Sequence, residues 1–327
     1  TYKVSMPVVR KALSEMEEEG VITIEHGRGS FINCIPSEDA LFREPEANSV
    51  LFLSCTFEIC DPFYSRVLMG AQDEAAVLGV NLIYAHPTEQ RPVEVLLSSA
   101  KHRGVILAGD VQKEHIDLVR QAGLPLVIAG DIDGQPSNAE FASIINDDFS
   151  GGYQAGKHLA KLGHTQIGVI AGEPRFNFWQ RRVDGLKRAL LEENIVVTKK
   201  QIIRFHDQRP QDGRRGMDQL MALPDRPTAV FAANDRFAYG VYAWCQEHGY
   251  SIPDDLSVVG FDDLDLSNEL LPPLTTIRPN AQGFGRYAMQ VLAEQVDSEH
   301  YVPNQKVLPV SMIERESTAP LVTQMAQ

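Results

Sequence analysis

Polar and aromatic side chains recur in this sequence at or just after the ends of short apolar runs. The residues of this kind are Phe63, Tyr64, Asp131, Asn146, Phe178, Trp179, Arg182, Asn234, Asp235 and Asp262. Carboxylate and amide groups can form paired hydrogen bonds with neighbouring hydroxyl groups, and flat aromatic rings can cover the C–H faces of a ring-shaped molecule. This mixture predicts the binding of a small polyhydroxylated ligand.

Asp147 and Asp148 follow Asn146 at the same strand end. These two residues, and several of the ten, also have a purely structural interpretation. Asp147 or Asp148 could cap the helix that follows them, and Asn234 or Asp235 could cap the next helix in the same way. Trp179 could pack inside a lobe instead of stacking on a ligand. The shared position of the set at strand ends supports binding more strongly than any single member does.

The elements that must position these residues are strands alternating with helices. We predict strands at 50–54, 80–85, 104–109, 124–130, 142–145, 167–172, 228–234 and 256–261, and helices at 63–78, 113–122, 151–162, 181–193, 212–222, 236–248 and 281–296. Such alternation indicates βαβ units with mostly parallel strands, and these units are too many for one doubly wound sheet. We therefore expect an α/β body of two lobes, with the ligand outside the carboxyl ends of the strands.

The composition suits a large protein that contacts nucleic acid only locally. The chain has 327 residues, 43% of them hydrophobic, and a formal net charge of −14. Because an acidic protein repels phosphate, any contact with DNA must be confined to a small region. No stretch is long and apolar enough to cross a bilayer, and no signal peptide is visible, so we expect a cytoplasmic protein without a membrane partner.

Neither metal binding nor catalysis is indicated by the motifs. Cys34, Cys55, Cys60 and Cys245 form no Cys-x-x-Cys pair and have no cluster of histidines beside them, so we interpret them as reduced, structural thiols. The motifs of phosphate-binding loops, serine hydrolases and zinc proteases are absent. We expect no enzyme activity, no cofactor and no metal.

The opening segment predicts a helix. Ser5 can cap a helix in which Val9, Leu13 and Met16 recur at helical spacing. Gly20 suits the left-handed position that ends such a helix.

Two short strands, at 21–24 and 30–32, follow this helix, with the turn "EHGRG" between them. A helix followed by a two-stranded wing is the second half of a winged helix-turn-helix, whose helix enters the major groove. The residues expected to face DNA are Ser5, Met6, Val8, Arg10, Lys11, His26, Gly27 and Arg28.

The stretch "SMPVVRKALSEMEEEGVITIEHGRGSFI", residues 5–32, resembles the GntR-type DNA-binding domain. Met6 and Pro7 stand where that family usually has Arg and Thr. The family's first helix and most of its second would lie before Thr1.

The body, residues 49–315, resembles the effector-binding domain of LacI/GalR-type regulators, which is similar to periplasmic sugar-binding proteins. The resemblance is carried by "INDDFSGGYQAGKHLAKLGHTQIGVIAG", "QRRVDGLKRAL" and "SIPDDLSVVGFDDLDLSNELLPPLTTIRP". It implies that Arg182 grips ligand hydroxyls or a carboxylate, which favours a neutral or an acidic sugar, and that Asp262 contacts the ligand. It also implies ligand contacts for Phe63, Tyr64, Asn234 and Asp235, and it matches Asp131 and Asn146 more loosely.

A GntR-type head on a LacI-type body looks like the arabinose-repressor type of regulator. We therefore expect a partial winged helix-turn-helix at 1–33, a linker at 34–48 and a periplasmic-binding-protein-like body at 49–327. Within the body, lobe 1 is expected at about 49–147 and 279–304, and lobe 2 at about 148–278 and 305–320.

The expected function is that of a ligand-responsive transcriptional regulator, a repressor, whose partners are operator DNA, a sugar or related polyol, and a second copy of itself. A single DNA-reading unit in each chain is the reason for expecting a homodimer. The alternative is a periplasmic-type sugar-binding protein of a transport system.

Overall fold

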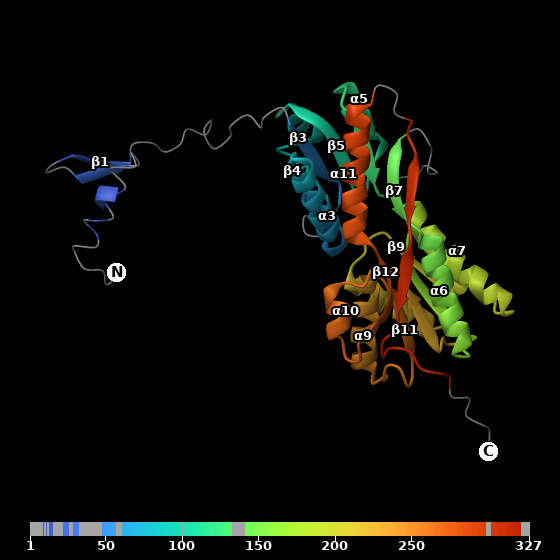
Figure 1. Cartoon of the computed structure of the whole chain (residues 1–327). Helices are drawn as coiled ribbons and strands as arrows, with labels where there is room; N and C mark the ends of the chain where they lie inside the picture. The colour runs from blue at the N-terminus through green and yellow to red at the C-terminus, as the bar shows by residue number, and fades with distance from the viewer. Residues whose placement is uncertain are drawn as a thin grey trace, which may run out of the picture. The chain divides into compact units, whose positions relative to one another are not determined.

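The computed structural model describes residues 9, 11, 13–15, 22–25, 29–32, 48–56, 61–99, 101–132, 141–298 and 302–321 (Figure 1). The chain divides into two compact units, Thr1–Ala47 and Asn48–Gln327. Within the described residues, no helix combines the length and the apolar character needed to cross a membrane.

The first unit contains the predicted hairpin. Strand β1 (Ile22–Glu25) pairs antiparallel with β2 (Gly29–Ile32), and Val9, Lys11 and the residues 13–15 are helical. Lys11 is exposed, and its Nζ lies 3.8 Å from Glu15 Oε1. The other residues expected to face DNA lie outside the described residues; they are Ser5, Met6, Val8, Arg10, His26, Gly27 and Arg28.

The second unit consists of two lobes, each built on a six-stranded sheet. The first sheet has the order β13-β7-β6-β5-β3-β4, and all of its pairs are parallel. Its strands are β3 (Ser49–Ser54), β4 (Asn81–Ala85), β5 (His102–Ala108), β6 (Leu126–Ala129), β7 (Ala142–Asn146) and β13 (Gln305–Leu308).

The second sheet has the order β14-β12-β11-β10-β8-β9, in which only the pair of β14 with β12 is antiparallel. Its strands are β8 (Ile167–Gly172), β9 (Ile202–Phe205), β10 (Ala229–Ala232), β11 (Ser257–Phe261), β12 (Thr275–Pro279) and β14 (Val310–Ile313). The prediction of a two-lobed α/β body with mostly parallel sheets is confirmed.

Helices cover both faces of each sheet. The first lobe carries α3 (Pro62–Leu78), α4 (Val93–Ser98), α5 (Lys113–Gln121) and α11 (Ala281–Asp297); the second carries α6 (Asp148–Lys161), α7 (Asn177–Glu192), α8 (Pro210–Met221), α9 (Asp235–His248) and α10 (Asp265–Glu269). In β3, Val50 and Phe52 pack with α3 and α11, whereas Leu51 and Leu53 pack with α4 and α5. This alternation is what a strand buried on both faces requires.

The chain passes between the lobes at three places in the described residues: after β7, after β12, and between β13 and β14 (Figure 1). Residues 305–308 were expected in lobe 2. Strand β13 instead pairs with β7, so these residues belong to the first sheet, and the third crossing falls between Leu308 and Val310.

Two glycines bring α6 and α7 into close contact. A Cβ atom on Gly152 would lie 1.9 Å from the carbonyl oxygen of Arg182, and one on Gly185 would lie 1.9 Å from that of Phe149. Only glycine permits such an approach of two helix backbones. The approach places the side chain of Arg182 beside the first turn of α6.

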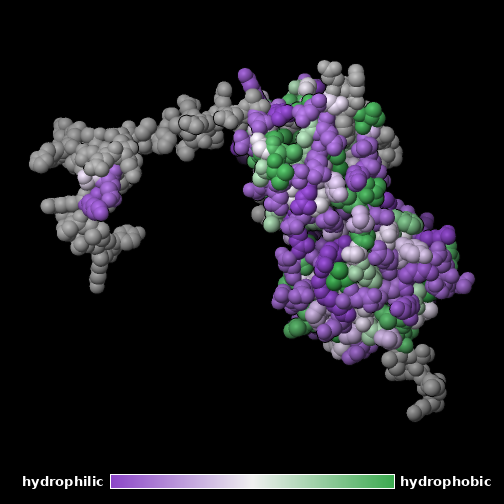
Figure 2. All heavy atoms as spheres, in the orientation of Figure 1, coloured by the Kyte–Doolittle hydropathy of each residue, from purple (hydrophilic) through white to green (hydrophobic). Residues whose placement is uncertain are grey.

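Apolar side chains remain exposed along α3 and β4 of the first lobe. Met69 is 53% exposed, Val77 78%, Leu78 40% and Tyr84 39%. Figure 2 shows apolar surface in this region of the lobe. On the second lobe, Leu266 and Leu271 are exposed as well. Exposed apolar area of this kind favours contact with another protein surface.

Candidate ligand-binding site

A cavity of about 160 Å³ lies between the two lobes and is lined by residues of both. Nine of the ten residues predicted to bind a ligand line it: Phe63, Tyr64, Asp131, Asn146, Phe178, Trp179, Arg182, Asn234 and Asp262. They converge because the carboxyl ends of parallel strands meet at one edge of each sheet, and the two edges face one another across the cavity.

Helix caps hold several of these residues in place. Asp61 caps α3 by accepting a 3.0 Å hydrogen bond from the backbone N–H of Tyr64, which places Phe63 and Tyr64 in the first turn. Asn234 caps α9 by accepting a 2.8 Å bond from the N–H of Phe237. In both cases a capping residue follows a strand, so the start of the helix lies at the cavity.

The guanidinium group of Arg182 is buried and has three polar partners. Its Nε donates to Asp148 Oδ1 at 2.8 Å, its Nη1 donates to the carbonyl of Ala233 at 2.7 Å, and its Nη2 lies 3.4 Å from Asp262 Oδ1. Its central carbon lies 3.6 Å from the ring centroid of Phe261, a cation–π arrangement. Arg182 therefore joins α6, α7 and the ends of β10 and β11.

The two carboxylates around Arg182 are held in an environment that disfavours their charge. Burial raises the pKa of Asp262 well above its usual value, and it also raises the pKa of Asp148, while the positive charge of Arg182 opposes both shifts. Asp262 has φ of 108°, a conformation that side chains other than glycine rarely adopt. Its position is therefore imposed by its surroundings.

Polar contacts cross the cleft from Asp131 and from Arg66. Asp131 of the first lobe accepts a 2.7 Å bond from the backbone N–H of Phe178 and bonds of 2.9 and 3.1 Å from Nη2 of Arg181. Arg66, in α3, donates to the carbonyl of Asp263 at 2.8 Å and pairs with Asp265. These contacts hold the lobes together around the cavity.

Asp235 is the one predicted ligand-binding residue that does not line the cavity. It is fully buried, and its carboxylate accepts hydrogen bonds from Leu264 N at 2.8 Å, Ser267 Oγ at 2.6 Å and Thr276 Oγ1 at 2.6 Å. As the first residue of α9, it points into the lobe, whereas the preceding Asn234 faces the cavity. The carboxylate therefore joins α9 to the elements that follow β11.

Sequence reasoning missed part of the lining. The additional polar residues there are Thr56, Asp61, Asp110, Asp148, Arg181, Asp207, Gln208, Arg209 and Arg236. Residues 207–209 follow β9, a strand that was not predicted, so these residues were not expected at the end of a strand. Asp147 and Asp148 were expected at the strand end, with helix capping as the alternative; Asp147 caps α6, whereas Asp148 pairs with Arg182 and lines the cavity.

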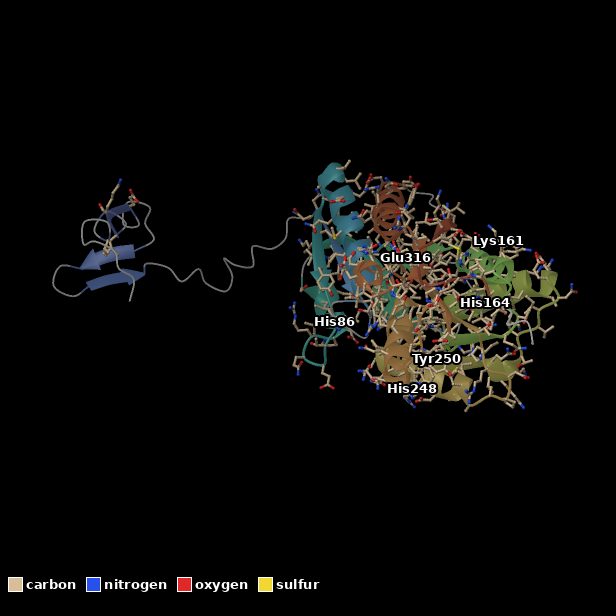
Figure 3. The ribbon with its side chains drawn as sticks, turned by 90° about the horizontal axis from the view of Figure 1, so that it is seen from below. His86, Lys161, His164, His248, Tyr250 and Glu316 are labelled. Carbon is tan, nitrogen blue, oxygen red and sulfur yellow. The ribbon has the colours of Figure 1, made fainter. Side chains whose placement is uncertain are left out.

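His164 of the second lobe serves packing. His164, labelled in Figure 3, contacts Thr228 Oγ1 at 2.9 Å through Nδ1, and Ser257 Oγ and the carbonyl of Ala319 at 3.1 Å through Nε2. Although a serine and a histidine are paired here, both are buried and neither lines the cavity. In the described part of the chain, no three His, Cys, Asp or Glu side chains are grouped to hold a metal ion.

Two facing lobes around a polar cavity define a periplasmic-binding-protein-like fold. The family model of the periplasmic binding protein-like domain matches residues 157–318. The HTH-type transcriptional repressor PurR of Mannheimia succiniciproducens is 31% identical over 242 residues, which are 72% of this chain and 71% of that repressor. The HTH-type transcriptional repressor CytR of Escherichia coli is 31% identical over 269 residues, 81% of this chain and 78% of CytR.

Solved structures agree with this fold. A LacI family transcriptional regulator from Enterococcus faecium with bound ribose superposes with a TM-score of 0.72 at 29% identity, covering 84% of this chain and all of that one. The complex of the regulator CelR with cellobiose shares the fold, with a TM-score of 0.77 at 22% identity, covering 97% of this chain and 92% of that one. The chain belongs to the LacI family, whose members named here are transcriptional regulators and not enzymes.

The buried carboxyl group of Asp235 predicts a pH dependence of stability. Burial raises its pKa from 3.8 to about 6, against three hydrogen bonds that lower it. Because the folded state holds this proton more tightly, the group's contribution to stability is complete below its unfolded pKa and is lost as the pH rises through about 6. At 1.36 kcal/mol per pKa unit, the loss is about 3 kcal/mol. Asp235→Asn cannot ionise and should lose less stability over that range.

Urea denaturation of the two proteins between about pH 4 and pH 7 measures this difference. The free energy of unfolding of the natural protein should fall relative to that of Asp235→Asn as the pH rises. Parallel curves would show that Asp235 titrates alike in the folded and unfolded states.

Arg182→Met should destabilise the protein by about 3 kcal/mol, because it leaves Asp262 buried without this cation and leaves Asp148 with only the 3.4 Å contact to Arg181. Adding Asp148→Asn should recover part of the loss, since a buried charge that has lost its nearer cation is then removed. Arg188→Met is the matched control: Arg188 lies on the same helix, is 63% exposed in its side chain and pairs only with Glu192 among the described ion pairs. An equal, small effect of both arginine substitutions in chemical denaturation would contradict a central role for Arg182.

Proposed function

We propose that this protein is a transcriptional repressor whose affinity for operator DNA is controlled by a sugar or sugar-like effector bound between its lobes. The observation that carries the proposal is the cavity, whose polar and aromatic lining comes from both lobes. Two relatives that the chain resembles over most of its length are repressors, and the similar Enterococcus faecium regulator was solved with ribose.

The DNA-reading part of the proposal is the winged helix-turn-helix segment at 1–33. Its support is the described hairpin of β1 and β2, the helical residues before it, and the GntR-like motif. With a net charge of −14 for the whole chain, the affinity for phosphate must come from local basic side chains such as Arg10, Lys11 and Arg28. The proposed location is the cytoplasm, where operator DNA is found.

Control by the effector follows from contacts made with both lobes. A ligand that touches Phe63 and Asn146 on one side and Phe178 and Asn234 on the other binds fully only when the cleft is closed. It therefore stabilises the closed arrangement by its difference in affinity for the two arrangements. Coupling of this kind is typically about 1–3 kcal/mol and is reciprocal between DNA and effector.

Operator titration tests the proposal. Duplexes that bind the full-length protein are first selected from a random DNA pool. The selected duplex is then titrated with the protein in the presence and absence of a saturating sugar. That sugar is chosen from those that raise the melting temperature of the protein. We expect the affinity for DNA to change by roughly 5- to 150-fold with sugar and to fall steeply with salt. Arg10→Ala should weaken DNA binding with or without sugar.

The same titration separates the alternatives. A protein that binds sugar but whose DNA affinity is unaffected by it is not a sugar-controlled regulator. A protein that binds sugar and no DNA at all is better described as a periplasmic-type sugar-binding protein, which shares this fold.

We also propose that the body forms a homodimer. One DNA-reading segment per chain binds weakly alone, and two-fold related half-sites are the usual solution. The exposed apolar residues of α3 and β4, with Leu266 and Leu271 on the second lobe, offer a surface for such contact. Light scattering at tens of micromolar should give the mass of a dimer, and Val77→Glu should shift it towards the monomer because it buries a charge in the contact. A monomer in the unsubstituted protein would disprove the dimer.

A further inference from the structure

We propose that the cleft selects a neutral, hydroxyl-bearing ring of monosaccharide size over its carboxylated or phosphorylated counterpart, and that Asn146 and Arg181 together recognise one hydroxyl group of that ring. The inference rests on the proposed sugar-type effector site and specifies which sugars it takes. The cavity volume of about 160 Å³ is below the roughly 300–1,000 Å³ of pockets that hold drug-sized ligands, which suits a small ring.

The arginine expected to attract an acidic ligand already has acidic partners in the protein. The Arg182 guanidinium contacts Asp148, the carbonyl of Ala233 and Asp262. Two of these partners are carboxylates, so the positive charge is already balanced within the protein. A ligand carboxylate would therefore approach a cation that lies beside two other carboxylates, which weakens its attraction.

The remaining charges of the lining also oppose an anion. Six carboxyl groups face four guanidinium groups; they are Asp61, Asp110, Asp131, Asp148, Asp207 and Asp262 against Arg181, Arg182, Arg209 and Arg236. With all of these groups ionised, the excess is two negative charges. An anionic ligand would therefore lose its hydration and meet net repulsion, whereas a neutral ligand would not.

Two buried polar atoms of the lining have no hydrogen-bond partner among the described residues. One is Oδ1 of Asn146, a residue that is only 7% exposed, and the other is Nε of Arg181. Asn146 ends β7 in the first lobe, and Arg181 lies on α7 in the second. Both residues line the cavity, so a group bound there can serve as their missing partner.

The chemistry of the two atoms specifies that group. Asn146 Oδ1 only accepts a hydrogen bond, and Arg181 Nε only donates one. A hydroxyl group can donate to the first and accept from the second, whereas a carboxylate or phosphate oxygen without a proton can serve only the arginine. Asp131 fixes Arg181 from the opposite lobe through Nη2, so its Nε is held in one orientation.

Isothermal titration calorimetry with matched neutral and acidic sugars tests the selection. The probes are D-ribose with ribose 5-phosphate, D-glucose with D-glucuronate, and D-galactose with D-galacturonate, each titrated into the full chain. We expect a neutral member to bind and its acidic partner to bind about 100-fold more weakly or not at all.

Substitutions test the assignment of the two residues. Asn146→Leu and Arg181→Lys should each weaken binding of the neutral sugar by about tenfold or more, since a buried partner is lost. Arg181→Lys keeps a cation beside Asp131, which guards against misfolding, but it lacks the Nε donor. Arg188→Lys on the same helix is the matched control and should bind like the unsubstituted protein.

Monodeoxy versions of the bound sugar identify the hydroxyl group. The unsubstituted protein should discriminate strongly against one of them, and Asn146→Leu should lose most of that discrimination. A merely structural role for Asn146 would weaken all of the sugars equally and leave the discrimination intact.

The outcomes separate this inference from the proposed function. If the acidic member of a pair binds as tightly as the neutral one, or if both substituted proteins bind like the control, the inference is wrong while the sugar-controlled regulator stands. If none of the six probes binds, both the inference and the sugar effector fall, and the affinity for DNA is tested separately by operator selection.

Discussion

The buried guanidinium of Arg182 is the interaction on which the arrangement around the cleft depends. Its partners come from α6, from the turn between β10 and α9, and from the end of β11, so one cation connects three segments that are far apart in sequence. The contact is possible because Gly152 and Gly185 let α6 and α7 approach closely. A charge this deeply buried is stable only with carboxylates beside it, which explains why Asp148 and Asp262 accompany it.

The turn after β11 contains backbone strain, and this network of ion pairs holds the strained residues in place. Asp262 and Asp263 both have positive φ, at 108° and 47°, in a region where residues with side chains are uncommon. Asp262 is held by Arg182, while the carboxylate of Asp263 pairs with Arg278 and Arg315. Arg278 lies on β12, just before one of the crossings between the lobes. The strained turn therefore links the cavity to a strand that ends at one of the crossings between the lobes.

Because the two lobes meet through polar contacts, closing the cleft need not depend on ligand alone. Asp131 and Arg66 of the first lobe bind groups of the second lobe without any ligand contact. An effector then shifts an existing equilibrium between the open and closed arrangements of the lobes. The size of this shift depends on the difference between its affinities for the two arrangements. Within the proposed function, this balance is what would transmit the occupancy of the cavity to the DNA-reading segment.

The sequence by itself determined the alternation of strands and helices, since apolar runs of strand length and amphipathic helices each leave a periodic pattern. It also determined that polar residues gather at strand ends, and nine of the ten chosen do line one cavity. It did not reveal β9, β12, β13 or β14. Of these, β9, β13 and β14 are edge strands whose residues are partly exposed, whereas β12 is buried except at Arg278 but carries polar threonines in place of a continuous apolar run. Only the tertiary structure decided which of two adjacent polar residues serves the cavity. Asn234 faces the cavity, whereas Asp235 faces the core. In the same way, Asp147 caps α6, whereas Asp148 binds Arg182. Adjacent residues at a helix start point in different directions, and what each meets there is set by elements distant in the chain.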